Sequence, residues 1–230
     1  GRMLSGDDVG VLLADHLLAR GARPGSFATT IVSSSLLAAM CQRHGVPYAE
    51  TLTGFKWIVR SADDVAYGYE EALGYAVAPH LVRDKDGISA ALLLAEMAAG
   101  LKANGRTLLD RLDELAEDYG LYATEQFSVR VADLSLIAAA MSRLRAAPPT
   151  ELLEREVISV EDLLPDSDVV RIRTDGVRVV VRPSGTEPKL KIYLEVVRPV
   201  ADRDLAEVRA TAAAELAQLR TQLAVVLAIS

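Results

Sequence analysis

The 230-residue sequence lacks several features that define large classes of proteins. It has one cysteine, Cys41, so no internal disulfide can form. It has no unbroken apolar run near the roughly 20 residues that a membrane-spanning helix needs. Its first eight residues lack the basic stretch and apolar core of a secretory signal. We therefore expect a soluble globular protein in the reducing cytoplasm, without a membrane partner.

Positive charge and histidine are also scarce. The 25 Lys and Arg residues are outnumbered by 32 Asp and Glu, which gives a net charge of -7 and a pI near 5.1. Proteins that bind nucleic acids usually carry a broad basic surface, so a nucleic-acid partner is not expected. The three histidines, His16, His44 and His80, do not have the spacing of metal ligands. Any anion site must therefore be sought in particular loops.

The first part of the chain alternates between helix and strand signals. A capping box from Ser5 to Asp8 predicts a helix that runs to Gly21. The further predictions are strands at 27–32 and 48–52, a helix that ends at Gly45, and helices at 88–103 and 106–118. Ser33, Ser34 and Ser35 stand where a helix cap is expected. This order predicts a βαβ domain with a mixed, mostly parallel sheet.

The later part of the chain has the signals of an antiparallel sheet. Two prolines at 148 and 149 oppose helix continuation, so we place the domain boundary between residues 147 and 148. Asp175 and Gly176 separate two β-rich runs and predict a hairpin. A strand at 189–197 and an amphipathic helix from Leu205 complete the pattern. Residues 148–230 are therefore predicted to form a smaller α+β domain with a C-terminal helix.

The densest chemistry lies in residues 182–189, with the sequence RPSGTEPK. Arginine can bind a phosphate at two points, two hydroxyls can donate hydrogen bonds, and a glycine exposes backbone amides to an anion. Composition alone favours an ordinary surface turn, because Pro, Ser and Gly are common in turns. The ordered string favours a phosphate site.

Three other segments carry candidate ligands. Residues 67–75 (YGYEEALGY) place Glu70 and Glu71 where carboxylates could accept sugar hydroxyls, although a solvated acidic turn is the simpler interpretation. Residues 53–58 contain Gly54 and Lys56, and a lysine there could equally be a solvated head on a buried stem. Residues 82–89 contain Lys85 between two aspartates, which are better explained as helix caps than as metal ligands.

These segments together resemble the C-terminal half, the third and fourth domains, of the α-D-phosphohexomutases (phosphoglucomutase/phosphomannomutase family). The resemblance continues through residues 189–195 (KLKIYLE) and covers nearly the whole chain. It implies two sets of ligands and no catalytic or metal-binding residue in this chain. The implied phosphate ligands are Arg182, Ser184, Gly185, Thr186, Lys189 and Lys85, and the implied sugar ligands are Glu70, Glu71, Gly54 and Lys56.

The resemblance also implies a partner and a reaction. A hexose phosphate (glucose or mannose 1-phosphate or 6-phosphate) would be isomerised through a phosphoserine and a bisphosphorylated intermediate. The phosphoserine loop and the Mg²⁺ loop belong to N-terminal domains that we do not find here, so we expect an excised piece or one part of a split protein. Ala72 stands where many members carry serine, which leaves a phosphopentomutase or a sugar-bisphosphate synthase open. A non-catalytic sugar-phosphate-binding or regulatory module is the other alternative.

Overall fold

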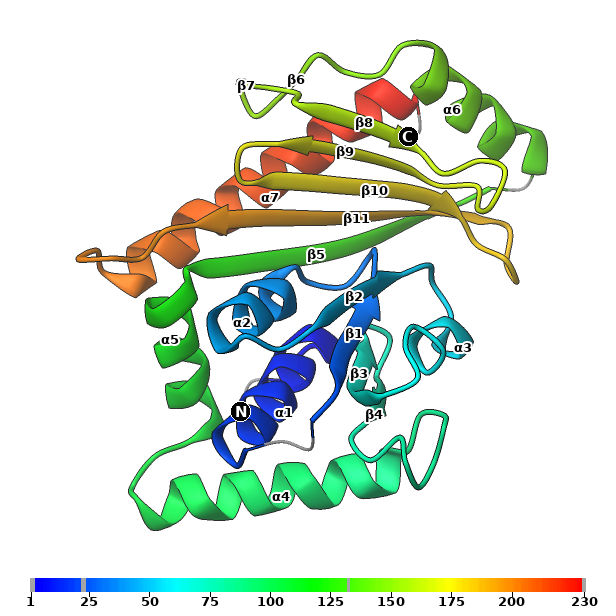
Figure 1. The fold of residues 1–230 in the computed structure, drawn as a ribbon. Helices are drawn as coiled ribbons and strands as arrows, with labels where there is room; N and C mark the ends of the chain where they lie inside the picture. The colour runs from blue at the N-terminus through cyan, green and yellow to red at the C-terminus, as the bar shows by residue number, and fades with distance from the viewer. Residues whose placement is uncertain (1–2, 22–23, 132, 229–230) are drawn as a thin grey trace. The chain divides into compact units, whose positions relative to one another are not determined.

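The computed structural model describes residues 3–21, 24–131 and 133–228, and it divides the chain into two compact units, Gly1–Tyr119 and Gly120–Ser230 (Figure 1). The division does not lie between residues 147 and 148, where the prolines predicted it. Residues 121–130 form strand β5 (Leu121–Arg130), which pairs along its whole length with β11 (Lys189–Arg198). A ten-residue strand in that sheet belongs to the second unit, so the prolines lie inside this unit.

The first unit contains a four-stranded sheet in the order β2-β1-β3-β4. Its strands are β1 (Ser26–Thr30), β2 (Tyr48–Thr51), β3 (Val65–Glu70) and β4 (Gly74–Ala76). Strand β1 is parallel to both β2 and β3, whereas β4 returns antiparallel to β3. The prediction of a mixed, mostly parallel sheet is confirmed.

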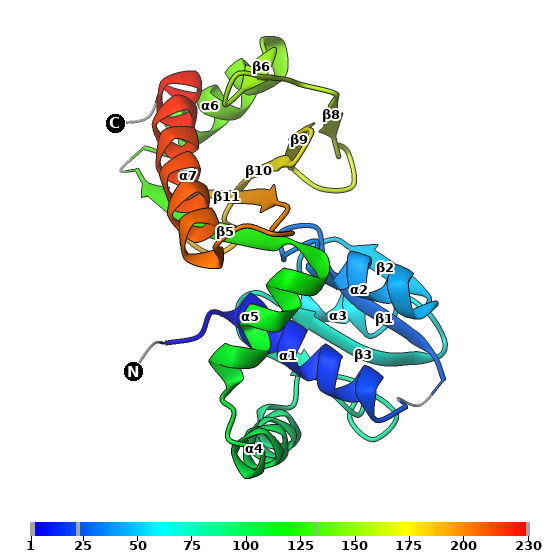
Figure 2. The same ribbon diagram turned by 90° about the vertical axis from the view of Figure 1, so that its left-hand side faces the viewer.

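Helices cover this sheet on both faces. They are α1 (Gly6–Ala19), α2 (Leu36–His44), α3 (Phe55–Ile58), α4 (Gly87–Ala103) and α5 (Leu108–Tyr119). Figures 1 and 2 show α1, α2 and α5 on one face and the short α3 on the other. The Ser5–Asp8 capping box is present at the start of α1, as predicted. Cys41 of α2 is buried among apolar side chains.

The second unit is built on a five-stranded sheet in the order β5-β11-β10-β9-β8, in which every neighbouring pair is antiparallel. Its other elements are α6 (Leu134–Ala146), β6 (Glu151–Leu152), β7 (Arg155–Glu156), β8 (Ser159–Asp162), β9 (Val170–Thr174), β10 (Val177–Pro183) and α7 (Leu205–Leu227). The predicted hairpin joins β9 to β10, and Gly176 adopts the positive φ of 73° that this tight turn requires.

One face of this sheet forms the core of the second unit. Alternate residues of β11, from Leu190 to Val196, pack with helices α6 and α7, as the two-residue period predicts. On α7 the buried residues recur every three or four positions, from Val208 to Leu227. On the opposite face, Glu195 is buried and lies 3.1 Å from the guanidinium of Arg178.

None of the helices in the described ranges combines the length and the apolar character that crossing a bilayer requires.

Candidate functional site

Three loops of the first unit meet at the carboxyl edge of its parallel strands. They follow β1 at Thr30, β2 at Thr51 and β3 at Glu70. In open α/β sheets, ligands bind outside the carboxyl ends of the strands. The predicted sugar ligands Gly54, Glu70 and Glu71 therefore lie at the edge of the sheet where a ligand is expected.

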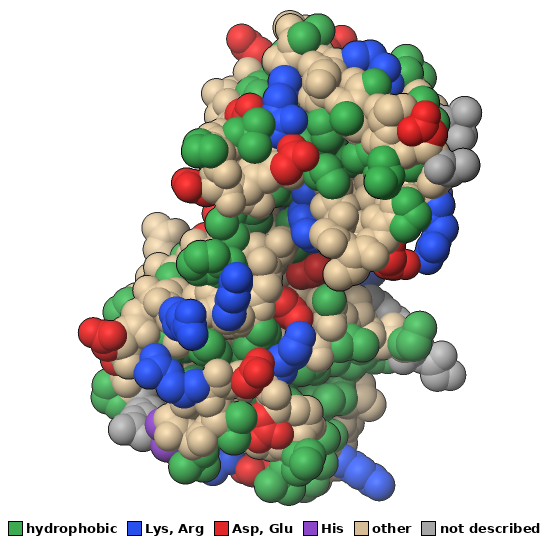
Figure 3. Space-filling view, turned by 90° about the vertical axis from the view of Figure 1, so that its right-hand side faces the viewer, with side chains coloured by type: hydrophobic (Ala, Val, Ile, Leu, Met, Phe, Trp, Pro, Cys, Tyr) green, Lys and Arg blue, Asp and Glu red, His purple; other side chains and the backbone are tan. Residues whose placement is uncertain are grey.

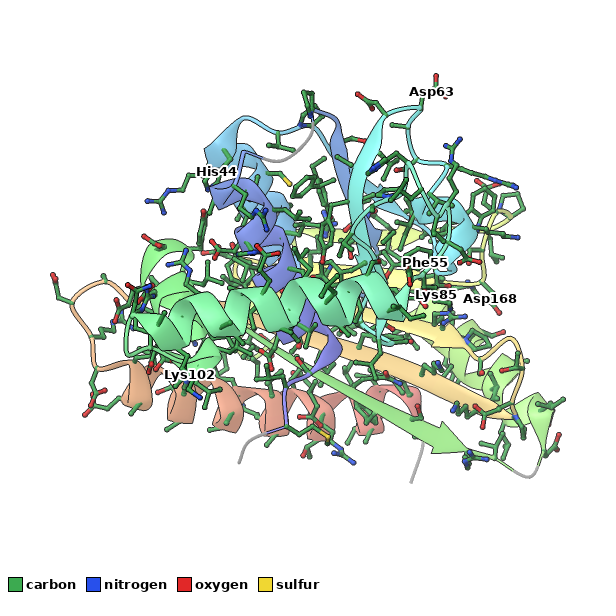
Figure 4. The ribbon with its side chains drawn as sticks, turned by 90° about the horizontal axis from the view of Figure 1, so that it is seen from below. His44, Phe55, Asp63, Lys85, Lys102 and Asp168 are labelled. Atoms are coloured by element: carbon green, nitrogen blue, oxygen red, sulfur yellow. The ribbon has the colours of Figure 1, made fainter. Side chains whose placement is uncertain are left out.

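Glu70 lies at the end of β3 and is held close to Lys85. The Nζ atom of Lys85 lies 3.1 Å from Oε1 of Glu70 and 5.8 Å from the centre of the Phe55 ring. Figure 4 shows Phe55 and Lys85 side by side near the start of α4, whereas His44 lies apart from them. The structure thus brings Glu70 and Lys85 together, although 15 residues separate them in the chain.

Gly74 leaves room for the Glu70 side chain. A Cβ atom at position 74 would lie 2.8 Å from Cγ and 2.9 Å from Oε1 of Glu70. Any larger residue would therefore displace the carboxylate. The glycine explains why Glu70, with a side chain only 12% exposed, still reaches Lys85.

Glu71 is oriented differently from Glu70. Its carboxylate accepts hydrogen bonds from Ser33 (3.2 Å) and Thr30 (3.4 Å), and its backbone amide donates to Oγ of Ser33 (3.1 Å). Ser33 and Thr30 are almost fully buried. The sequence assigned the same role to both glutamates, whereas the structure shows Glu70 bound to a half-exposed lysine and Glu71 bound to buried hydroxyls.

The triple serine fills its predicted role as a helix cap only in part. Ser35 occupies the cap position of α2 but its side chain makes no capping hydrogen bond. Ser34 accepts a hydrogen bond from the amide of Leu36 (3.2 Å), and Ser33 binds Glu71 instead. The sequence of a helix start does not show whether its serine hydroxyls bind amides of the same helix, as Ser34 does, or a distant loop, as Ser33 does.

Gly54 and Lys56 lie at the start of α3. Gly54 adopts φ 119° and ψ 126°, which a residue with a side chain rarely adopts. The Nζ atom of Lys56 lies 5.0 Å from the centre of the Trp57 ring, and both side chains are exposed. This geometry fits the alternative of a solvated lysine head.

Of the two aspartates in the 82–89 segment, Asp86 caps a helix as predicted, whereas Asp84 accepts a hydrogen bond from the amide of Lys85 (2.7 Å). Asp86 accepts hydrogen bonds from the amides of Ile88 (3.0 Å) and Ser89 (3.3 Å) at the start of α4. The hydrogen bonds from Ser89 and Ile88 hold the pKa of Asp86 below its ordinary value.

Across the described ranges, no group of three or more His, Cys, Asp or Glu residues is arranged to hold a metal ion. Those residues therefore do not fit a magnesium site.

The candidate phosphate loop of the second unit joins β10 to β11. Its base is closed by a hydrogen bond from the amide of Ser184 to the carbonyl of Lys189 (2.8 Å). A second bond runs from the amide of Lys189 to the carbonyl of Glu187 (2.8 Å). Gly185 and Thr186 lie at the exposed tip, and a Cβ atom at Gly185 would meet nothing within 4 Å.

Three predicted phosphate ligands keep their side chains available in this loop. The guanidinium of Arg182 and the hydroxyls of Ser184 and Thr186 form no hydrogen bond or ion pair with any described residue. Side-chain donors that are not used within the protein can serve an external anion. The loop therefore presents one cation and two hydroxyls within five residues.

Lys189 is engaged in a different way. Its Nζ atom lies 2.5 Å from Oε2 of Glu187, whose other oxygen lies 2.8 Å from Arg130 of β5. The hydrogen bond and positive charge of Lys189, followed by those of Arg130, hold the pKa of the Glu187 carboxyl below its ordinary value. The predicted ligand Lys189 therefore shares a carboxylate with a second cation.

The strand register adds a residue that the sequence analysis did not select. Lys191 is the cross-strand partner of Arg182 in the β10–β11 pair, so their side chains project from the same face. Like charges in directly opposite positions repel each other, and an anion near both would offset this repulsion. The alternation of lysines at 189 and 191 was visible in the sequence, but the pairing with Arg182 required the register.

Charge is mixed over the surface seen in Figure 3, where acidic and basic side chains are interspersed. The loop at 182–189 contributes two cations, Arg182 and Lys189, and one carboxylate, Glu187, to a chain with a net charge of -7.

The first unit is an α/β unit with a mostly parallel sheet, and the second is an α+β unit with an antiparallel sheet. Residues 5–119 match the family model for phosphoglucomutase/phosphomannomutase α/β/α domain III, and residues 127–221 match that for the C-terminal domain of the same family. The chain belongs to the phosphoglucomutase/phosphomannomutase family.

Curated proteins with similar sequences carry the names of the same family. A probable phosphomannomutase of Haemophilus influenzae is 41% identical over 199 residues, which cover 84% of this chain and 41% of the relative. A phosphoglucomutase of Staphylococcus aureus strain USA300 is 32% identical over 226 residues, covering 86% of this chain and 41% of the relative. The chain thus spans about two fifths of the length of these relatives.

Two solved structures have a similar fold. Parafusin (phosphoglucomutase) from Paramecium has a TM-score of 0.74 at 22% identity, with 97% of this chain and 42% of that chain covered. N-acetylphosphoglucosamine mutase from Aspergillus fumigatus, in complex with GlcNAc-6P and magnesium, has a TM-score of 0.52 at 18% identity, with 98% and 47% covered.

Proposed function

We propose that this chain supplies the substrate recognition of a phosphohexomutase that interconverts 1-phospho and 6-phospho sugars. In this proposal the first unit binds sugar hydroxyls through Glu70, and the second unit binds phosphate through Arg182, Ser184, Gly185 and Thr186. The observation that carries the proposal lies in the candidate phosphate loop. The guanidinium of Arg182 and the hydroxyls of Ser184 and Thr186 form no hydrogen bond or ion pair with any described residue.

The chemistry of such a reaction explains the type of site. Phosphoryl transfer depends mainly on positioning and on stabilisation of charge, so a mutase needs ligands that hold the sugar phosphate in place. A mutase acting through a phosphoserine and a bisphosphorylated sugar must accept its intermediate in two orientations. A carboxylate that accepts from hydroxyls, together with a guanidinium and two hydroxyls that donate to phosphate, suits that requirement.

Magnesium and the phosphorylated serine belong, in this proposal, to parts of the enzyme other than the described residues. The related fungal mutase is known in complex with magnesium, whereas the described residues of this chain offer no metal-binding group. Magnesium would stabilise charge on the transferred phosphoryl group. The free and buried thiol of Cys41 is consistent with action in the cytoplasm.

The residue after the two glutamates bears on which sugar is preferred. Ala72 follows the two glutamates and is exposed, so this position supplies no hydroxyl to the substrate. That observation favours, as a second candidate, a phosphopentomutase or a sugar-bisphosphate synthase of the same family.

The test is an activity assay of the full-length protein that carries this chain, with glucose 1-phosphate, mannose 1-phosphate and ribose 1-phosphate as substrates. We expect isomerisation of a hexose phosphate, and Arg182→Ala should lower kcat/KM on the order of a hundredfold. Preference for ribose 1-phosphate would select the second candidate. Unchanged kinetics of Arg182→Ala would refute the assigned phosphate site, and no turnover of any sugar phosphate would refute the mutase.

A further inference from the structure

A buried serine, Ser33, helps to hold the loop that carries Glu70 and Glu71. Oγ of Ser33 lies 3.1 Å from the amide nitrogen of Glu71, 3.2 Å from its carboxylate and 2.8 Å from Oγ of Thr30. A hydroxyl has one proton to donate and two lone pairs to accept with. Ser33 can therefore accept from the Glu71 amide and donate to the Glu71 carboxylate, while Thr30 supplies the third contact.

The same loop is held on its other side by the start of α1. A Cβ atom at Gly6 would lie only 1.9 Å from the carbonyl oxygen of Glu71, so the two backbones are in close contact. The hydroxyl of Tyr75 donates to the carbonyl of Gly6 (3.1 Å). The loop backbone at Glu71 is thus fixed from two directions.

The contacts that hold Glu71 bear on the direction of the neighbouring side chain, that of Glu70. Glu70 and Glu71 are adjacent at the end of β3, so fixing the backbone and carboxylate of Glu71 inward leaves Glu70 directed to Lys85. A buried polar network in which each donor finds an acceptor favours a single geometry. Losing the Ser33 hydroxyl would remove its hydrogen bonds with the Glu71 amide and carboxylate and would loosen that geometry.

We propose that Ser33 is a positioning residue for sugar recognition: through the backbone and carboxylate of Glu71 it sets the orientation in which Glu70 meets the sugar hydroxyls. The proposal rests on the proposed function and refines it. Glu71 acts in it as an anchor of the loop, and Glu70 is the ligand.

The test measures binding to the 230-residue chain by calorimetry, with glucose 1-phosphate and glucose 6-phosphate as sugar probes and inorganic phosphate as the second probe. Ser33→Ala should raise Kd for the sugar phosphates about tenfold and leave Kd for inorganic phosphate within about twofold. A change confined to the sugar probes is what loss of Glu70 orientation produces.

Ser34→Ala is the matched control. Ser34 is the buried neighbour of Ser33, and its hydroxyl accepts from the amide of Leu36. We expect a comparable loss of stability in urea but no change in the ratio of sugar-phosphate to phosphate affinity. An equal change in that ratio for both variants would show a general structural effect and would overturn the proposal.

A double-mutant cycle provides the decisive measurement. If Ser33 acts through Glu70, then Ser33→Ala added to Glu70→Gln should change the sugar-phosphate Kd by no more than about twofold. A further tenfold loss in that background would overturn the proposal. Thr30→Val, which removes the second hydroxyl of the network, should weaken sugar-phosphate binding about threefold and decides the matter if Ser33→Ala does not fold.

The proposed function can fail separately. If the wild-type chain binds no sugar phosphate, the proposed function of this site is overturned together with the role of Ser33. If the wild type binds and Ser33→Ala binds equally well, only the role of Ser33 is overturned.

Discussion

The carboxylate of Glu70 and the ammonium of Lys85 form an ion pair at 3.1 Å, in which the lysine side chain is 52% exposed and the glutamate side chain 12% exposed. Water screens the charge at the exposed lysine end of this pair, and holding the long lysine side chain in place costs entropy, so the lysine adds little to stability. A ligand can therefore compete for Lys85 at low cost. This property suits the proposed function, in which the site receives sugar hydroxyls and a phosphate.

Replacement of Lys85 tests whether its charge serves the substrate. Lys85→Met should raise Kd for glucose 6-phosphate about tenfold at low salt, and less at about 0.3 M NaCl, because salt screens the lost attraction. Calorimetry at the two salt concentrations measures both values. Lys102→Met is the control, since Lys102 is near the other end of α4 (Figure 4) and should leave binding unchanged. Equal effects of the two substitutions would contradict a specific role of Lys85.

Gly74 is predicted to be required for the position of Glu70. Gly74→Ala places a Cβ atom 2.9 Å from Oε1 of Glu70, so the carboxylate must move away from Lys85. We expect several-fold weaker binding of sugar phosphates and unchanged binding of inorganic phosphate. Gly87→Ala serves for comparison, because a Cβ atom there meets nothing within 4 Å. If Gly74→Ala binds sugar phosphates as tightly as the wild type, the orientation of Glu70 does not matter for binding.

Glu187 is predicted to weaken the phosphate loop by neutralising Lys189. Glu187→Gln removes the carboxylate shared by Lys189 and Arg130 and keeps the backbone carbonyl that accepts from the Lys189 amide. Phosphate affinity should rise a few-fold, most clearly at low salt, as a titration with inorganic phosphate would show. Glu125→Gln, which removes a carboxylate bound to Arg220 in the same unit, should have no such effect. A loss of affinity in Glu187→Gln would mean that the carboxylate is needed to order the loop.

Buried acids of the first unit predict a loss of stability at alkaline pH. Burial raises the pKa of Cys41 from 9.0 to about 12, and burial also raises the pKa of Tyr67, Tyr69 and Tyr75 above 10.0. The folded state therefore retains protons that the unfolded state releases, so stability is complete below pH 9 and falls as the pH rises further. The free energy of unfolding in urea should drop on the order of 1 kcal/mol between about pH 8.5 and 10.

Cys41 provides a second readout of the same burial. Its thiol should not react with a disulfide reagent in the folded protein at about pH 8 and should react fully in guanidinium chloride. In Cys41→Ala the alkaline loss of stability should be smaller by the contribution of one group. Rapid reaction of the folded protein, or stability that rises above pH 9, would contradict the burial.

The sequence by itself determined the elements whose signals are local. The capping box at Ser5 and Asp8, the Asp175–Gly176 turn and the spacing of apolar residues on α7 each depend on neighbouring residues, and all three are confirmed. The ordered string at 182–189 also identified the family, because it is read along the chain without knowledge of any distant contact.

The tertiary structure decided what depends on residues far apart in the chain. Strand β5 joined the second unit because it pairs with β11, although its sequence gave no sign of that partner. The same is true of the two glutamates. Glu70 and Glu71 are chemically identical and adjacent, and only the folded chain brings Lys85 to the first and Ser33 to the second. Hydrogen bonds and charges act over a few ångströms in space, so the different roles of two identical side chains appear only once the fold has selected their neighbours.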